Sequence, residues 1–198
     1  MTTTMGATTP STVPDTRWRT RDIVVAAVIG VAFGVVFWVW GLVWYGPLQF
    51  IGELAFPLRD LFYAVWLIPA VLGPLIIRKP GAALFTEMVG AGVSALLGSV
   101  WGVDTLLSGF VQGAAAELVF AFTLYRVWTL PVLGVAAVAS AAAAWVHDWV
   151  LYYADRDLVV QLLRGVFMAI SAVVIVAGGS VALHRALKQA GALEGFPD

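Results

Sequence analysis

Two rows of acidic and aromatic side chains have the composition of a small-molecule site. Asp60, Tyr63 and Trp66 are spaced three residues apart, so a helix brings them onto one face. A second row has helical spacing and consists of Trp145, Asp148, Trp149 and Tyr152. A carboxylate among aromatic rings suits a flat, cationic or hydrogen-bonding heterocycle, through stacking and cation–π attraction. The alternative is that each row only anchors its helix at a membrane surface.

Further polar residues interrupt apolar runs. They are Glu87, Gln112, Glu117, His147, Asp148 and Arg164. A charge at the centre of a membrane helix costs about 3 kcal/mol, so such residues usually face a cavity or a protein partner. We predict ligand or gating roles for Gln112 and Glu117, and we include His147 in the site with Asp148. Glu87 is interpreted as structural, and Arg164 is left open between a counter-ion and a functional group.

Several enzyme classes are excluded by the residues that the chain lacks. It has no cysteine and two histidines, and it contains neither an HExxH motif nor a Walker A sequence. We therefore predict no catalytic residue, no bound metal and no cofactor, and we expect that the chain is not an enzyme.

The composition predicts that these residues lie in a lipid bilayer. Of 198 residues, 61% are hydrophobic and only 12% are charged, whereas soluble domains are about one-quarter charged. Apolar runs approach the roughly 20 residues that a membrane span requires. The predicted spans are 23–45, 61–77, 82–101, 106–125, 130–152 and 158–187. We predict an all-α bundle of six transmembrane helices, with a disordered cytoplasmic tail at 1–16, a membrane domain at 17–188 and a cytoplasmic C-terminal tail at 189–198.

The positions of Lys and Arg predict the orientation. With both termini in the cytoplasm, the internal segments contain Arg17, Arg19, Arg21, Arg78, Lys79, Arg126, Arg185 and Lys188. The external loops then hold only Arg59 and Arg156, as the positive-inside rule requires. In this orientation most of the nine tryptophans fall in the outer half, which favours an aromatic cavity open to the outside.

The first span carries a row of small residues. Ala26, Gly30 and Gly34 are four residues apart, so they form one groove on a helix that another backbone can approach closely. The groove can accept another helix of the same chain or a partner subunit, and periodicity alone leaves both open.

Four sequence segments carry a resemblance to a known family. They are IRKPGAALFTE (77–87), VQGAAAELVF (111–120), LPVL (130–133) and HDW (147–149). With six spans in about 200 residues, they resemble the YkoE family. Its members are substrate-binding (S) components of energy-coupling factor (ECF) transporters for thiamine or its hydroxymethylpyrimidine precursor.

The resemblance implies a place and partners for the chain. It implies a multi-pass protein of a bacterial plasma membrane that captures the vitamin outside with high affinity. The partners would be a transmembrane coupling (T) subunit and two ABC ATPase subunits, and no nucleic acid is expected. It favours Ala26, Gly30 and Gly34 as the docking face. The alternative function is a stand-alone, proton-coupled secondary transporter of a small cationic or heteroaromatic solute, and the choice between thiamine and its precursor stays open.

Overall fold

The apolar run that follows the N-terminal arginines forms one continuous helix, α1 (Thr20–Tyr45). The computed structural model describes residues 16–196, so the predicted tail at 1–16 lies almost wholly outside the described residues. In the first turn of α1, the Asp22 carboxylate accepts a hydrogen bond from the Arg19 N–H at 2.9 Å, which satisfies one of the donors that a helix start leaves free. A short helix, α2 (Pro47–Leu54), follows directly.

The second span is broken in the middle. A 3-10 helix, η1 (Phe56–Leu67), leads through Ile68 into α3 (Pro69–Ile77). Proline has no N–H, so Pro69 cannot donate a hydrogen bond back to η1, and α3 begins at this residue. Ile68 keeps right-handed helical angles (φ −62°, ψ −46°), so the chain passes from one helix into the next without leaving the helical region. Every residue of α3 is buried, and α3 therefore forms the centre of the fold.

The third span is shorter than predicted. Helix α4 (Ala82–Leu96) ends before Gly98 and Gly102, whose φ values of 89° and 56° are incompatible with a right-handed helix. Trp101 therefore leaves the helix and lies in the connection to α5 (Asp104–Phe122).

The remaining helices agree closely with the predicted spans. Helix α6 covers Leu130–Tyr152. The last span contains α7 (Leu158–Ser171), a π-helical segment η2 (Ala172–Gly178) and α8 (Gly179–Gln189). Among the described residues, five helical stretches are long and apolar enough to cross a membrane, and α4 is a sixth, shorter apolar helix. The all-helical fold is confirmed, while the count of six spans stays a prediction.

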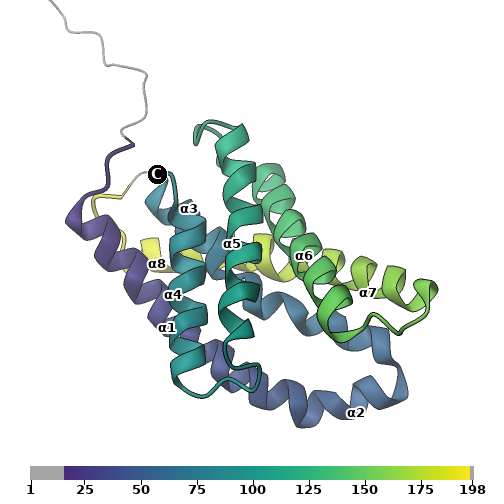
Figure 1. The fold of residues 1–198 in the computed structure, drawn as a ribbon. Helices are drawn as coiled ribbons and strands as arrows, with labels where there is room; N and C mark the ends of the chain where they lie inside the picture. The colour runs from purple at the N-terminus through teal and green to yellow at the C-terminus, as the bar shows by residue number, and fades with distance from the viewer. Residues whose placement is uncertain (1–15, 197–198) are drawn as a thin grey trace, which may run out of the picture.

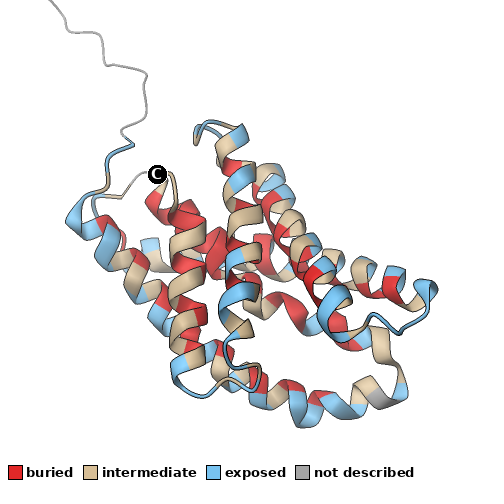
Figure 2. Ribbon diagram, viewed as in Figure 1, coloured by how far each residue is buried: buried red, intermediate tan, exposed pale blue. Residues whose placement is uncertain are grey.

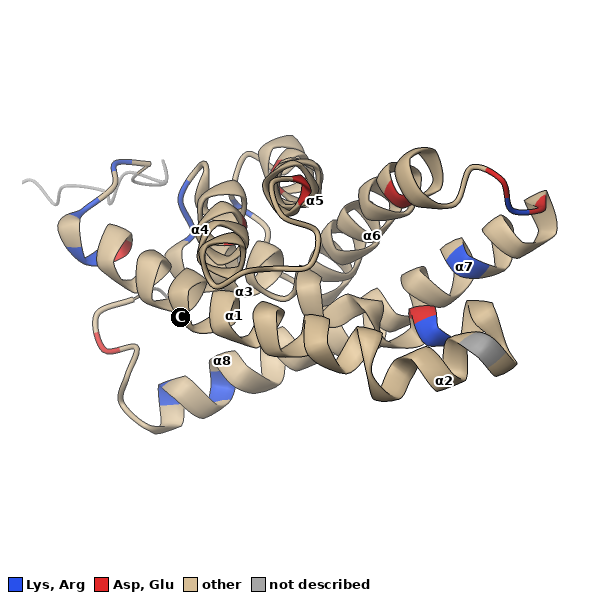
Figure 3. Cartoon of the chain, turned by 60° about the horizontal axis from the view of Figure 1, so that its bottom comes forward, with Lys and Arg blue, Asp and Glu red and all other residues tan. Residues whose placement is uncertain are grey.

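Helices α1, α4, α5 and α6 lie side by side, each packed on the next, and η1 and α7 lie against each other (Figure 1). Buried residues follow the inner sides of these helices, and exposed ones follow the outer sides (Figure 2). After its first turn, α1 carries no charged residue along the rest of its length (Figure 3), and its exposed side chains include Val28, Val35 and Leu42. An apolar outer surface of this kind is what lipid requires.

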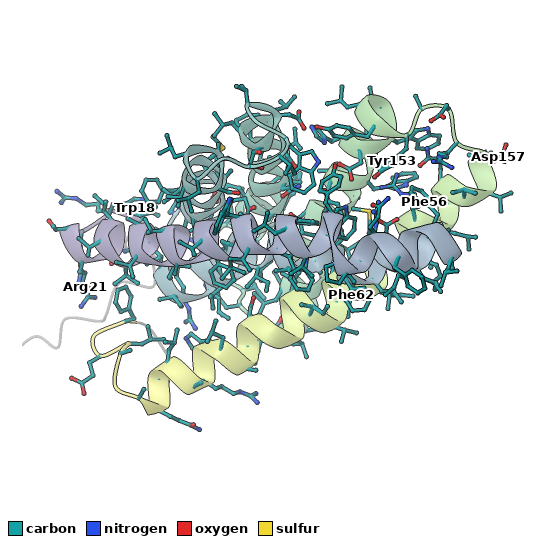
Figure 4. All side chains as sticks on the ribbon, turned by 90° about the horizontal axis from the view of Figure 1, so that it is seen from below. Trp18, Arg21, Phe56, Phe62, Tyr153 and Asp157 are labelled. Atoms are coloured by element: carbon teal, nitrogen blue, oxygen red, sulfur yellow. The ribbon has the colours of Figure 1, made fainter. Side chains whose placement is uncertain are left out.

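The two ends of the described chain lie at the same end of the bundle. The Trp18 indole donates to the Pro80 carbonyl at 2.8 Å, and the Arg21 guanidinium lies 4.9 Å from the Phe196 ring centroid. Trp18 and Arg21 lie far from Tyr153 and Asp157, which mark the opposite end (Figure 4). The two ends of the described chain therefore lie on one side of the bundle, and the position of the termini stays a prediction. That this side is the cytoplasm remains a prediction from the positive-inside rule.

Candidate ligand-binding site

A cavity opens among α1, η1, α4, α5 and α6, with about 690 Å³ of open space including its mouth. Its aromatic lining consists of Phe37, Trp44, Tyr45, Tyr63, Trp66, Trp101, Tyr152 and Tyr153. Its polar lining consists of Glu87, Ser94, Ser99, Asp104, Thr105, Ser108, Gln112, His147 and Asp148. A concave site with an apolar wall and a few polar groups is the usual form of a small-molecule site.

The aromatic wall is a set of edge-to-face contacts. The Trp66 ring centroid lies 4.9 Å from that of Trp44 and 5.3 Å from that of Trp101, at interplanar angles of 68° and 89°. Tyr63 lies 5.2 Å from Trp66 with a similar tilt. Such contacts are favourable and hold the rings in fixed orientations, so the wall is preorganised for a flat ring.

A buried arginine links three elements beside the cavity. Arg164 on α7 is 1% exposed, and its guanidinium lies 2.9 Å from the Asp60 carboxylate and 3.5 Å from that of Asp148. Removing one partner from such a group leaves an uncompensated buried charge. Arg164 is therefore a counter-ion that joins α7 to η1 and α6. Asp60, predicted as a ligand contact, does not line the cavity, and Arg164 connects it to Asp148, which does.

His147 lies between two carboxylates at the mouth of the cavity. Its Nδ1 is 3.2 Å from Asp148 Oδ1, and its Nε2 is 3.1 Å from Asp104 Oδ1. The Tyr152 hydroxyl donates to the other oxygen of Asp104. Within residues 16–196, the polar partners of Asp104 are His147 and Tyr152, and it has no arginine or lysine partner. We refer to Asp104 and Asp148 as the mouth acids, and their charge favours a cation.

The structure brings several predicted residues together. The Tyr63 hydroxyl donates to Asp148 Oδ1 at 3.4 Å. The Gln112 amide donates to the Tyr63 hydroxyl at 3.4 Å and to Ser108 Oγ at 2.6 Å. Tyr63, Gln112 and Asp148 thus form one chain along the cavity wall, although they come from η1, α5 and α6.

Glu87 lines the inner end of the cavity, which we refer to as the floor. Its Oε2 accepts a hydrogen bond from the Ala70 N–H at 3.0 Å. This donor is free because Ala70 lies in the first turn of α3, where helix N–H groups have no internal partner. Through Oε2, Glu87 therefore stabilises the start of α3, which is the structural role predicted for it. The same side chain also lines the cavity.

Glu117 does not line the cavity, which corrects its prediction as a ligand residue. Its carboxylate accepts hydrogen bonds from the N–H groups of Gly81 at 2.6 Å and Ala83 at 2.9 Å, at the start of α4. The Tyr125 hydroxyl donates to it at 2.8 Å. Burial and the Glu117 carboxylate raise the pKa of Tyr125, so this hydroxyl stays protonated and remains a donor. Glu117 stabilises the start of α4, where a negative charge is favourable.

Trp145 and Trp149 also lie outside the cavity lining. The Trp145 indole donates to the Gln161 carbonyl on α7 at 2.9 Å, and Trp149 packs on Trp145 with ring centroids 5.0 Å apart. A row of four residues covers a broad stripe of a helix, so its two edges meet different neighbours. Asp148 and Tyr152 face the cavity, whereas the two tryptophans pack on the α7 side.

The small-residue row of α1 is occupied by α4. A Cβ atom on Gly30 would lie 2.6 Å from Val89 Cβ, and one on Gly34 would lie 2.5 Å from Val93 Cβ. Ala26 is fully buried as well. Within this chain, helix packing therefore fills the groove at Gly30 and Gly34, and the docking of a partner subunit at this face of α1 stays a prediction.

Several cavity residues were missed by the sequence prediction. Trp44, Trp101, Asp104 and Tyr153 lie near the ends of predicted helices, where the helical period cannot assign a face. The excess of aromatic residues in the outer half was the available signal, and it indicated the correct end of the bundle.

The chain is similar in sequence and in fold to known membrane transport proteins. Residues 21–143 match the family described as "ABC-type cobalt transport system, permease component". A Bacillus subtilis (strain 168) protein named as the HMP/thiamine permease protein YkoE is 38% identical over 115 residues, which are 54% of this chain and 58% of the relative's length. A solved structure described as an S-component of an ECF transporter superposes with a TM-score of 0.84 at 31% identity, covering 90% of each chain.

Proposed function

Because this chain belongs to the family of ABC-type transport permease components and is similar throughout to an ECF S component, we propose that it captures thiamine or its hydroxymethylpyrimidine precursor. The chain is a multi-pass protein of the bacterial plasma membrane and is not an enzyme. Capture would occur at the outer face, where the cavity mouth lies in the predicted orientation. The name of the Bacillus relative, which is matched over about half its length, supports this choice of ligand.

The observation that carries the proposal is the composition of the cavity. The three tryptophans Trp44, Trp66 and Trp101 offer stacking surface for a pyrimidine ring, and the mouth acids offer a negative charge for a thiazolium ring. The family description mentions cobalt. Within the described part of the chain, no group of three or more His, Cys, Asp or Glu residues is placed to hold a metal ion.

A binding titration tests the proposal. The purified chain should bind thiamine or hydroxymethylpyrimidine saturably in detergent, with quenching of tryptophan fluorescence. Trp66→Leu should weaken binding about tenfold, since stacking on an aromatic ring contributes on the order of 1 kcal/mol beyond the buried area. A matched control is Trp149→Leu, which lies outside the cavity. If the folded wild-type protein binds neither compound, the ligand assignment fails.

A transport assay tests the proposed partners. We expect uptake into liposomes only when a T subunit and two ATP-hydrolysing subunits are added with ATP. Uptake by this chain alone, driven by a proton gradient, would instead support the stand-alone secondary transporter.

A further inference from the structure

Two turns meet at the end of the bundle opposite to the cavity mouth. The α3–α4 turn (78–81) lies beside the N-terminal segment, because the Trp18 indole donates to one of its carbonyl groups. The α5–α6 turn (123–129) is joined to the start of α4 through Glu117, which accepts a hydrogen bond from the Tyr125 hydroxyl. Neither turn contributes a residue to the cavity lining, so ligand capture leaves both turns without a role.

The two turns place three cations around one tryptophan. The Arg78 guanidinium carbon lies 5.7 Å from the Trp128 ring centroid. Lys79 is the next residue of the chain, and Arg126 precedes Trp128 by two residues. Arg126 is exposed, and no acid pairs with it in the described part of the chain. We refer to Arg78, Lys79 and Arg126 as the basic cluster, and its charge suits the oxygens of a phosphate group.

The backbone of both turns adopts a conformation that helix ends usually assign to glycine. Arg78 ends α3 with a φ of 53°, and Leu124 and Tyr125 follow the end of α5 with φ values of 53° and 56°. Among the residues that the structure describes, these three are the non-glycine residues with positive φ. Such backbone costs free energy and persists where the surrounding structure holds it, which is frequent at functional segments. The two turns therefore hold the basic cluster and Leu124 in a fixed place.

Exposed apolar side chains accompany the basic cluster. Phe122, at the end of α5, is 86% exposed, and Leu130, at the start of α6, is 58% exposed. Leu124 lies between them in the chain and is 64% exposed. A free anion would use the cations alone. Cations beside an exposed apolar surface match both parts of a phospholipid, the charged headgroup and the acyl chains.

We propose that the basic cluster binds the phosphate headgroup of an anionic phospholipid, whose acyl chains lie along Phe122, Leu124 and Leu130. In the predicted orientation this lipid comes from the inner leaflet. Trp128 then lies at the level of the headgroups, where tryptophan is enriched in membrane proteins. The bound lipid connects the α3–α4 turn to the α5–α6 turn and stabilises this end of the bundle. It occupies a second site, separate from the vitamin site.

Unfolding midpoints of the purified full chain in detergent test the proposal. Phosphatidylglycerol should raise the midpoint by about 5 °C, clearly more than phosphatidylcholine with the same acyl chains. This comparison uses the wild-type protein and needs no variant. Arg126→Gln and Lys79→Gln should each weaken phosphatidylglycerol about fivefold, the factor expected for one cation near a lipid surface. Phe122→Ser removes an acyl contact, so it should weaken both lipids alike.

Arg185→Gln is the matched control, because it removes an exposed cation on α8, outside the basic cluster. Its affinity for phosphatidylglycerol should stay within about twofold of the wild type. An equal loss in Arg185→Gln and Arg126→Gln would indicate diffuse attraction to the whole basic end and would overturn the site. Equal stabilisation by phosphatidylcholine, or by inorganic phosphate without lipid, would overturn it as well.

Two further readouts separate this site from other roles. If Arg126→Gln keeps the affinity for phosphatidylglycerol but loses association with a T subunit, the basic cluster serves a protein partner and the lipid proposal fails. Binding of thiamine or hydroxymethylpyrimidine should be unchanged in Arg126→Gln, because the basic cluster lies away from the cavity. Failure of the lipid site is therefore distinct from failure of the proposed function.

Discussion

A single carboxylate, Glu117, and a pair of carboxylates, the mouth acids, lie near opposite ends of α5, and they are held by different kinds of donor. Glu117 accepts from the backbone N–H groups of Gly81, Ala83 and Leu84. The mouth acids, Asp104 and Asp148, are held by side chains alone, and they border the cavity.

The difference separates a structural acid from an acid that is able to serve a ligand. Backbone donors are fixed by the fold, so Glu117 cannot exchange them without unwinding the start of α4. Side-chain donors rotate, so the mouth acids can exchange a partner for a ligand group at small cost. Glu117 and the mouth acids look alike in sequence, because each acid lies within or beside an apolar run.

The largest effect is expected from Arg164→Ala. It leaves the Asp60 and Asp148 carboxylates buried without their counter-ion, so the free energy of unfolding should fall by about 3 to 5 kcal/mol. Thermal unfolding of the purified protein in detergent measures this loss. Arg185→Ala, at an exposed position on α8, is the control and should change the midpoint little. An Arg164→Ala midpoint equal to the wild type would mean that the buried ion pairs do not form.

The next largest effect is expected from Gly30→Ala, which disturbs the packing of α1 on α4. The added methyl group would overlap Val89, so we expect destabilisation by about 1 to 3 kcal/mol. Gly92→Ala on α4 has no atom within 4 Å of the new methyl group, so it should be neutral or slightly stabilising. If Gly30→Ala keeps full stability but prevents assembly with a T subunit, the result supports the predicted docking face on α1.

Glu117→Gln tests the role of the carboxylate that the backbone N–H groups of α4 hold. The amide keeps one acceptor oxygen but loses the second acceptor and the charge, so stability should fall by about 1 to 2 kcal/mol. Ligand affinity in the remaining folded protein should stay within twofold, as measured by titration at a temperature well below unfolding. A large loss of affinity with unchanged stability would return Glu117 to the ligand site.

The smallest effect on stability is expected from Asp148→Asn at the mouth. Arg164 keeps its closer partner Asp60 at 2.9 Å, and the amide retains hydrogen-bonding capacity toward Tyr63 and His147, so the unfolding midpoint should change by the equivalent of about 1 kcal/mol. Thiamine should bind about fivefold more weakly, and hydroxymethylpyrimidine should change less, because only thiamine carries a fixed positive charge. Equal weakening of both ligands would argue against a charge contact at this end.

The sequence by itself determined the membrane-embedded helical fold and the aromatic end of the bundle. Composition and the length of apolar runs suffice for the first, since lipid excludes unpaired backbone groups and leaves helices as the simplest solution. The spacing of Tyr63 and Trp66, and of Asp148 and Tyr152, placed each pair correctly toward the cavity. These predictions depend only on the period of the helix that carries the residues.

The tertiary structure alone decided which acids serve the fold and which face the cavity. Glu87 and Glu117 are both glutamates within apolar helices, and their periodicity does not distinguish them. Their roles follow from neighbours distant in sequence: the break before Pro69 frees the Ala70 N–H for Glu87, and the turn at Gly81 presents its N–H groups to Glu117. The groove at Gly30 was likewise visible in sequence, but that α4 fills it was not. A helical period fixes the direction of a side chain around its own axis, whereas the identity of the neighbouring helix depends on how the whole chain packs.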